Sequence, residues 1–142
     1  MRGLLADVNF GGQLGRLLAV LQSPEWVKYW TDSGLVVETF ADLSLDPETN
    51  DRVVWQRCQA EMLLLITGNR NDDGPDSLEA AIRDGPPDAL PVLTVSNPGR
   101  VIGDGAYART VAVTLLEVVT DVVRRPELVL GTGRIYLPKY RL

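Results

Sequence analysis

Short apolar runs alternate along the chain with segments whose hydrophobic residues recur every three or four positions. The runs GLLADV, LVVETF, MLLLIT and PVLTVS have the length of β-strands, and LVVETF is enriched in β-branched residues. MLLLIT is the most continuous, which is typical of a central strand covered on both faces. Strands that alternate with helices predict an α/β protein, a three-layer sandwich with a mainly parallel central sheet.

Residues that start and stop helices divide the segments between these runs. A leucine pattern after Gly12 predicts a first helix. Ser23, followed by Pro24 at the first helical position, predicts a second helix to about Thr31. Gly34 should end this second helix.

The polar stretch before MLLLIT carries a strong helix start. Asp46 followed by Pro47 predicts a helix that runs to about Ala60. On this helix Asp51 shares a stripe with three apolar residues, Val54, Trp55 and Cys58. A carboxylate on an apolar stripe needs a partner, so we expect Asp51 at the rim of the core.

The second half of the chain predicts two further helices. Asp76 and Glu79 have the spacing of a capping box, and Gly85 with two prolines should end the helix that they open. The segment SNPGR predicts a turn. The longest helical pattern spans about 104–125 and should stop at Pro126.

Length and composition indicate one folded unit. The chain has 142 residues, 45% of them hydrophobic and 23% charged, so we expect a single domain over 1–142, with 126–142 as a C-terminal strand or arm. No apolar run reaches the length of a membrane span, and Asp7 interrupts the stretch that a signal peptide would need. We therefore expect a cytoplasmic protein that does not contact a membrane.

Two absences narrow the chemistry. The only cysteine is Cys58, which excludes an internal disulfide, and the chain has no histidine, which excludes a Ser-His-Asp triad and His-ligated zinc. The net charge of -5 argues against binding nucleic acid by overall electrostatics. Clustered acids that hold a divalent cation could still bring a phosphate to the protein.

Acidic residues follow two of the predicted strands. Ligand sites of parallel sheets lie beyond the carboxyl ends of the strands, so Asp7 and Asp51 could meet one or more of Asp72, Asp73 and Asp76 there. Such a cluster requires a raised pKa or a bound cation, and oxygen ligands select Mg²⁺ or Mn²⁺. The alternatives are that Asp76 is only a helix cap and that Asp72 and Asp73 are solvated loop acids.

Three stretches of the chain carry a family resemblance. LLADVN, ETFADLSLDPETNDRVVWQRCQAE and LLLITGNRN resemble, in order and spacing, the motifs of the DUF5615 (Mut7-C-like) branch of the PIN-like nuclease superfamily. The match covers about residues 1 to 80. By position, Asp7 matches the first metal-binding acid of the family, Asn9 the polar residue two places on, and Asp51 the acid at the start of the middle helix.

The third motif departs from the family pattern. Where the family has two aspartates after the strand threonine, this chain has Asn69 and Asn71 after Thr67, and its acids are displaced to Asp72 and Asp73. An asparagine carbonyl can ligate a metal but brings no charge, so metal affinity should fall.

The resemblance implies a PIN-like fold and an Mg²⁺- or Mn²⁺-dependent nuclease that acts on RNA. Asp7 and Asp51 would hold the metal and Asp72 or Asp73 would complete its ligand shell. Because members of this branch often pair with an antitoxin, it also implies a toxin role and a small inhibitory partner. The substrate-binding candidates, including Arg70 as a phosphate contact, are Asn9, Thr67, Asn69, Arg70 and Asn71.

Two other functions remain open. The chain could be a catalytically weakened PIN-like module for binding or assembly, which the two asparagines and the acidic isoelectric point of about 4.7 favour. It could also be a hydrolase of small phosphoesters that uses the same acids.

The remaining signals are weaker. The tail GTGRIYLPKYRL is basic and could contact a nucleic-acid backbone, or it could pack on the domain or on a second subunit. We expect a homodimer. Cys58 and the tryptophans should serve packing. The tail residues concerned are Arg134, Tyr136, Lys139, Tyr140 and Arg141.

Overall fold

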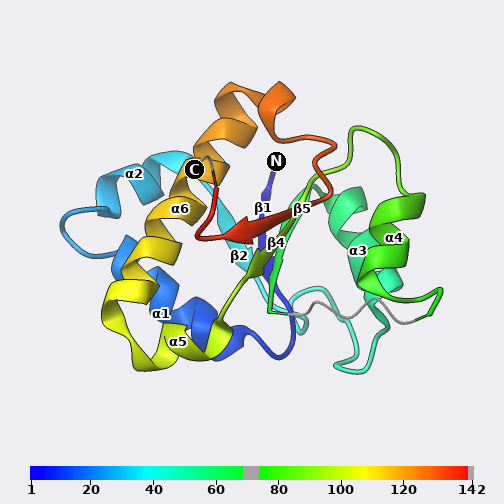
Figure 1. The fold of residues 1–142 in the computed structure, drawn as a ribbon, viewed down its shortest axis with the longest axis horizontal. Coiled ribbons are helices and arrows are strands. Elements are labelled where there is room, and N and C mark those ends of the chain that lie inside the picture. Colours follow the sequence, from blue (N-terminus) through cyan, green and yellow to red (C-terminus); the bar gives the residue numbers. More distant parts are fainter. Residues whose placement is uncertain (69–73, 141–142) are drawn as a thin grey trace.

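Five parallel strands form one sheet between two layers of helices (Figure 1). The computed structural model describes residues 1–68 and 74–140. The strand order is β2-β1-β3-β4-β5, so β3 is central. The strands are β1 (Gly3–Ala6), β2 (Val36–Glu38), β3 (Leu63–Thr67), β4 (Val92–Val95) and β5 (Arg134–Leu137).

Among the described residues, four helices cover one face of the sheet and two cover the other (Figure 1). The first group consists of α1 (Gly11–Leu21), α2 (Val27–Ser33), α5 (Pro98–Gly103) and α6 (Gly105–Arg124). The second consists of α3 (Asp51–Glu61) and α4 (Leu78–Asp84), and a 3₁₀ turn, η1 (Pro126–Leu128), follows α6. The α/β prediction is therefore confirmed, and the arrangement is consistent with a PIN-like sandwich.

Alternate residues of the strands enter two separate cores. Leu64 of β3 packs with α1 and α6, whereas its neighbour Leu65 packs with α3 and α4. This alternation follows from the period of two of a strand. All five residues of β3 are buried, as the continuous run MLLLIT predicted.

The predicted start of α3 is wrong by four residues. The side chain of Asn50 accepts a hydrogen bond from the Val53 N–H at 2.9 Å, so Asn50 is the cap and α3 begins at Asp51. Asp46 instead forms a turn, because its side chain accepts from the Glu48 N–H. A cap-like pair of residues therefore predicted a helix where the chain makes a local Asx turn.

Two other predicted helix starts also need correction. The Ser23 hydroxyl donates to the Val20 carbonyl at the end of α1, and α2 begins only at Val27. Ser77 caps α4, since its hydroxyl accepts from the Ala80 N–H, so Asp76 is not the cap.

Helix ends were predicted better than helix starts. Gly34 ends α2 with a φ of 67°, a left-handed conformation that favours glycine. The long helix α6 stops just before Pro126, as predicted, and Asp104 caps its first turn. SNPGR, which was expected to be a turn, leads into the short helix α5, because the Asn97 side chain caps it.

The C-terminal segment packs on its own chain. β5 pairs with β4, and its residue Leu137 is fully buried. The Tyr140 hydroxyl donates to the Asp121 carboxylate of α6 at 2.7 Å. None of the helices within residues 1–68 and 74–140 is both long and apolar enough to cross a membrane.

Candidate functional site

A row of polar residues crosses the carboxyl edge of the sheet on the side of α3 and α4. The Asp7 N–H donates to the Ile66 carbonyl at 2.9 Å, which extends the β1–β3 ladder beyond β1. The register then pairs Thr67 with Thr94 and Thr94 with Tyr136. Paired residues of parallel strands share a face, so these side chains lie on one line. We call Asp7, Thr67, Thr94 and Tyr136 the polar row.

The carboxylate of Asp7 is held in one orientation. Its Oδ2 accepts a hydrogen bond from the Thr67 hydroxyl at 2.9 Å, and its Oδ1 accepts from the Val8 N–H at 2.8 Å. Thr67 is fully buried, whereas Asp7 is half-buried. A carboxylate oxygen has two lone pairs, so each keeps the capacity for a further contact. Asn9 follows in the exposed turn before α1.

Asp51 belongs to the same edge of the sheet. Only Met62 separates α3 from β3, and a helix that precedes a parallel strand runs back along it, so the first turn of α3 lies at the carboxyl end of β3. Asp51 is half-buried. Val54, Trp55 and Cys58 on its stripe are buried, as the sequence pattern predicted.

The chain on both sides of residues 69–73 is fixed at this edge. A side chain at Gly68 would meet the ring of Pro98, with 2.8 Å from a Cβ to Cγ, so β3 ends in close contact with α5. On the other side, the Arg52 N–H donates to the Asp76 carbonyl at 3.1 Å, next to Asp51. The candidates Asn69, Arg70, Asn71, Asp72 and Asp73 lie outside the described residues.

Arg52 joins the start of α3 to the segment before α4. Its Nε donates to the Pro75 carbonyl at 2.8 Å, and its Nη2 lies 2.8 Å from the Asp84 carboxylate. The hydrogen bond from Arg52 holds the pKa of Asp84 below its usual value. Asp76 is exposed and lies 4.0 Å from the Arg52 Nε, so it is a surface ion-pair partner and not the helix cap that its spacing predicted.

Sequence reasoning missed the neighbour of the polar row, a buried arginine. Arg134 Nη1 donates to the Thr94 hydroxyl oxygen at 2.6 Å, and its Nε donates to Glu79 of α4 at 2.5 Å. The side chain of Arg134 is only 6% exposed, so it cannot contact a nucleic-acid backbone from the surface as the tail pattern suggested. Glu79 binds this arginine and does not serve a capping box.

The packing predictions hold. Cys58 is fully buried, and burial raises the pKa of its thiol to about 12. Trp30 and Trp55 belong to the two cores, and Trp26 packs against the larger one.

The described residues supply part of an oxygen-rich site. Asp7, Asn9 and Asp51 offer oxygen donors suited to Mg²⁺ or Mn²⁺, but residues 1–68 and 74–140 contain no group of three or more acids, histidines or cysteines placed to hold a metal. Comparisons of this chain with protein-family models, with curated proteins and with solved structures find no match.

Proposed function

We propose that this chain is a PIN-like, Mg²⁺- or Mn²⁺-dependent nuclease that cleaves RNA at the carboxyl edge of its sheet. The proposal rests on the resemblance of residues 1 to 80. The observation that supports it most directly is the Asp7 carboxylate, which Thr67 orients at that edge. Asp51 begins a helix at the same edge.

The residues fit such an ion by their donor chemistry. Asp7 and Asp51 would hold it, with Asp72 or Asp73 as the third acid. When bound, the ion would lower the pKa of a water molecule and neutralise charge on the phosphodiester.

The chain itself would position the reacting groups. Thr67 keeps Asp7 from rotating, because its hydroxyl donates to Oδ2. Because Thr67 is fully buried, it would act through Asp7. Asn69 would position the attacking water or the phosphate, and Arg70 would bind the phosphate. The same resemblance implies that a small antitoxin-like protein would inhibit the nuclease.

Thermal melting in manganese tests the metal site. A ligand of the folded state stabilises it by about 2.7 kcal/mol at one hundred times its Kd. We expect the wild-type Tm to rise by several degrees in millimolar Mn²⁺ and the rise to vanish in Asp7→Asn. Asp88→Asn is the matched control, because Asp88 is exposed and precedes β4 at the opposite edge. Equal responses of the two variants would contradict the proposal.

Cleavage assays distinguish the substrate. Mn²⁺-dependent cleavage of RNA that is absent in Asp7→Asn would support the nuclease. Cleavage of a chromogenic phosphodiester with RNA left intact would indicate a small-molecule hydrolase instead.

The second candidate is a binding or assembly module that keeps the fold without the chemistry. The observation in its favour is that Asn69 and Asn71 stand where the family has aspartates, so uncharged amides replace carboxylates at these two positions. Unchanged melting in millimolar Mn²⁺ would support this candidate.

A further inference from the structure

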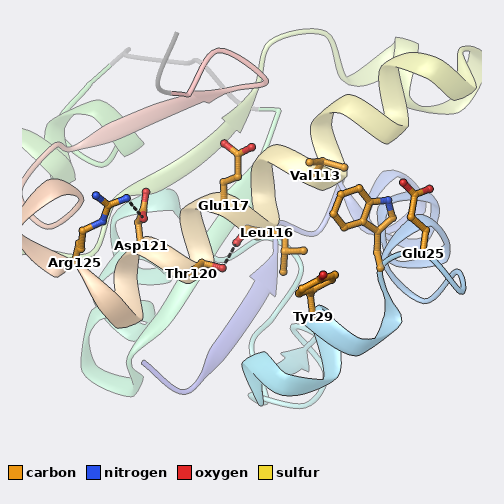
Figure 2. A pocket seen from close by; sticks show the side chains of 9 residues that line it. Glu25, Tyr29, Val113, Leu116, Glu117, Thr120, Asp121 and Arg125 are labelled. Atoms are coloured by element: carbon orange, nitrogen blue, oxygen red, sulfur yellow. Dashed lines mark hydrogen bonds and ion pairs between the residues drawn. The ribbon is translucent and has the colours of Figure 1, made fainter.

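A cavity of about 540 Å³ lies between α2 and α6, on the side of the sheet away from the polar row (Figure 2). This volume is within the range of small-molecule sites, about 300–1,000 Å³. One stripe of α6 forms its floor. The stripe runs over about three turns, with the spacing i, i+3, i+4, i+7, i+8 and i+12. Its residues are Val113, Leu116, Glu117, Thr120, Asp121 and Arg125.

Two aromatic side chains from the α2 region form the opposite wall. Trp26 and Tyr29 line the cavity, and their ring centroids lie 6.1 Å apart with a tilt of 51°. The ring of Tyr29 lies beside Leu116 in Figure 2, and Tyr29 is 59% exposed. Aromatic faces attract cations.

The charges around the cavity are unbalanced. Asp121 is buried and already satisfied by the Tyr140 hydroxyl at 2.7 Å and by Arg125 at 3.4 Å. Glu25 and Glu117 are exposed at the rim, and neither forms an ion pair within the described part of the chain. The excess charge is therefore negative, next to two aromatic rings.

A further polar group lacks a partner in this wall. The indole N–H of Trp26 is buried and has no acceptor among the described residues. A buried donor without an acceptor is unfavourable by about 1–3 kcal/mol. The wall of the cavity therefore contains one unsatisfied donor in addition to its two aromatic rings.

We propose that this cavity binds an organic cation with an apolar body. Trp26, Tyr29 and Leu116 would contact the body, and Glu117 would bind the ammonium or guanidinium group. Glu25, on the far side of Val113 in Figure 2, would add to the negative potential at the rim. The cation could be a free amine or the side chain of a lysine or arginine in a partner polypeptide, since both present the same chemistry. This site does not depend on the proposed nuclease function.

Calorimetric titration at low salt tests the charge requirement. We expect phenethylammonium to bind about tenfold more tightly than phenethyl alcohol, which has the same apolar body and no charge. We expect Glu117→Gln to weaken binding of the cation about two- to fivefold and to leave the alcohol unaffected. Glu48→Gln is the control, because it removes one exposed carboxylate outside the cavity and should change nothing.

Two results would overturn the proposal. The first is equal affinity for the alcohol and the cation, which would make the cavity merely apolar. The second is an equal loss in Glu48→Gln and Glu117→Gln, which would show attraction to the overall negative charge.

The aromatic wall is tested in the same way. Tyr29→Phe should keep the affinity for phenethylammonium, whereas Tyr29→Ala should lower it about two- to fivefold, because only the ring contributes. Equal affinity of Tyr29→Ala and wild type would remove Tyr29 from the proposal. A further titration with N-acetyl-arginine methylamide distinguishes the two sources of the cation. Tighter binding than phenethylammonium favours a side chain of a partner polypeptide, and weaker binding favours a free amine.

Discussion

The two faces of the sheet differ in what covers them. On one face, α1, α2, α5 and α6 enclose a large apolar core, and α6 alone contributes ten buried residues over 20 positions. On the other, α3 with 11 residues and α4 with 7 cover a smaller core. The polar row and Arg134 lie on this second face.

The difference follows from how much apolar surface each helix buries. Eight of the ten buried residues of α6 are apolar, and the two polar ones, Thr114 and Asp121, are hydrogen-bonded to Thr110 and Tyr140. Under the shorter helices, polar groups are buried with partners: Thr67 bonds Asp7, and Arg134 bonds Thr94 and Glu79. Buried polar groups are tolerated when they are hydrogen-bonded, so the face under α3 and α4 can hold the polar row while the face under α6 supplies most of the apolar burial.

The largest effect on stability should come from a substitution in the larger core, under α6. Leu115→Ala removes a fully buried side chain of α6, and we expect it to lower the free energy of unfolding by about 2–5 kcal/mol in urea denaturation. Any Mn²⁺-induced rise of Tm should survive in this variant, because Leu115 lies on the other face from Asp7. A loss of that rise in the folded variant would contradict a division of roles between the faces.

The buried arginine on the smaller face gives the next effect. Glu79→Gln removes the carboxylate that bonds the Arg134 guanidinium, and we expect a loss of about 1–3 kcal/mol by the same denaturation. The matched variant Glu127→Gln alters an exposed glutamate and should stay within about 0.5 kcal/mol of wild type. Equal stability of the two variants would show that the Arg134 pair contributes nothing.

Close packing between α3 and the end of α4 can be tested with a single methyl group. A Cβ at Gly85 would lie 2.4 Å from Trp55 Cη2, so Gly85→Ala should destabilise by about 1–3 kcal/mol. The same substitution at Gly15, in the interior of α1, meets open space and should stabilise by about 0.5–1 kcal/mol. If both substitutions changed the free energy of unfolding in the same direction, the close contact at Gly85 would not be the cause of its effect.

The smallest effect concerns the thiol of the smaller core. Burial raises the pKa of Cys58 from 9.0 to about 12. Between these two pH values the thiol is protonated in the folded protein and ionised in the unfolded chain. The contribution of this thiol to stability should therefore be constant below about pH 9 and fall between about 9 and 12. In Cys58→Ala this fall should be smaller in the same denaturation series. An identical pH dependence in both proteins would exclude the thiol as its cause.

The fold was more predictable than the site. Apolar runs located all four of the strands that they predicted, because burial of a central strand imposes a local pattern. The predicted helix starts at Ser23 and Asp46 were wrong. Both side chains have the chemistry of a helix cap, but they form hydrogen bonds with nearby backbone in turns. For the tail that contains Arg134, the sequence left open a nucleic-acid contact or packing on the domain, and the pairing of β5 with β4 shows packing.

The sequence by itself determined the α/β class, the burial of the central strand and the apolar stripe that includes Asp51, since these depend on periodicity within a few residues. Only the tertiary structure decided which polar groups meet. Thr67 and Asp7 are 60 positions apart, and Arg134 and Glu79 are 55 apart. Such contacts depend on strand order and register, which arise from the packing of the whole chain and leave no mark in the local pattern.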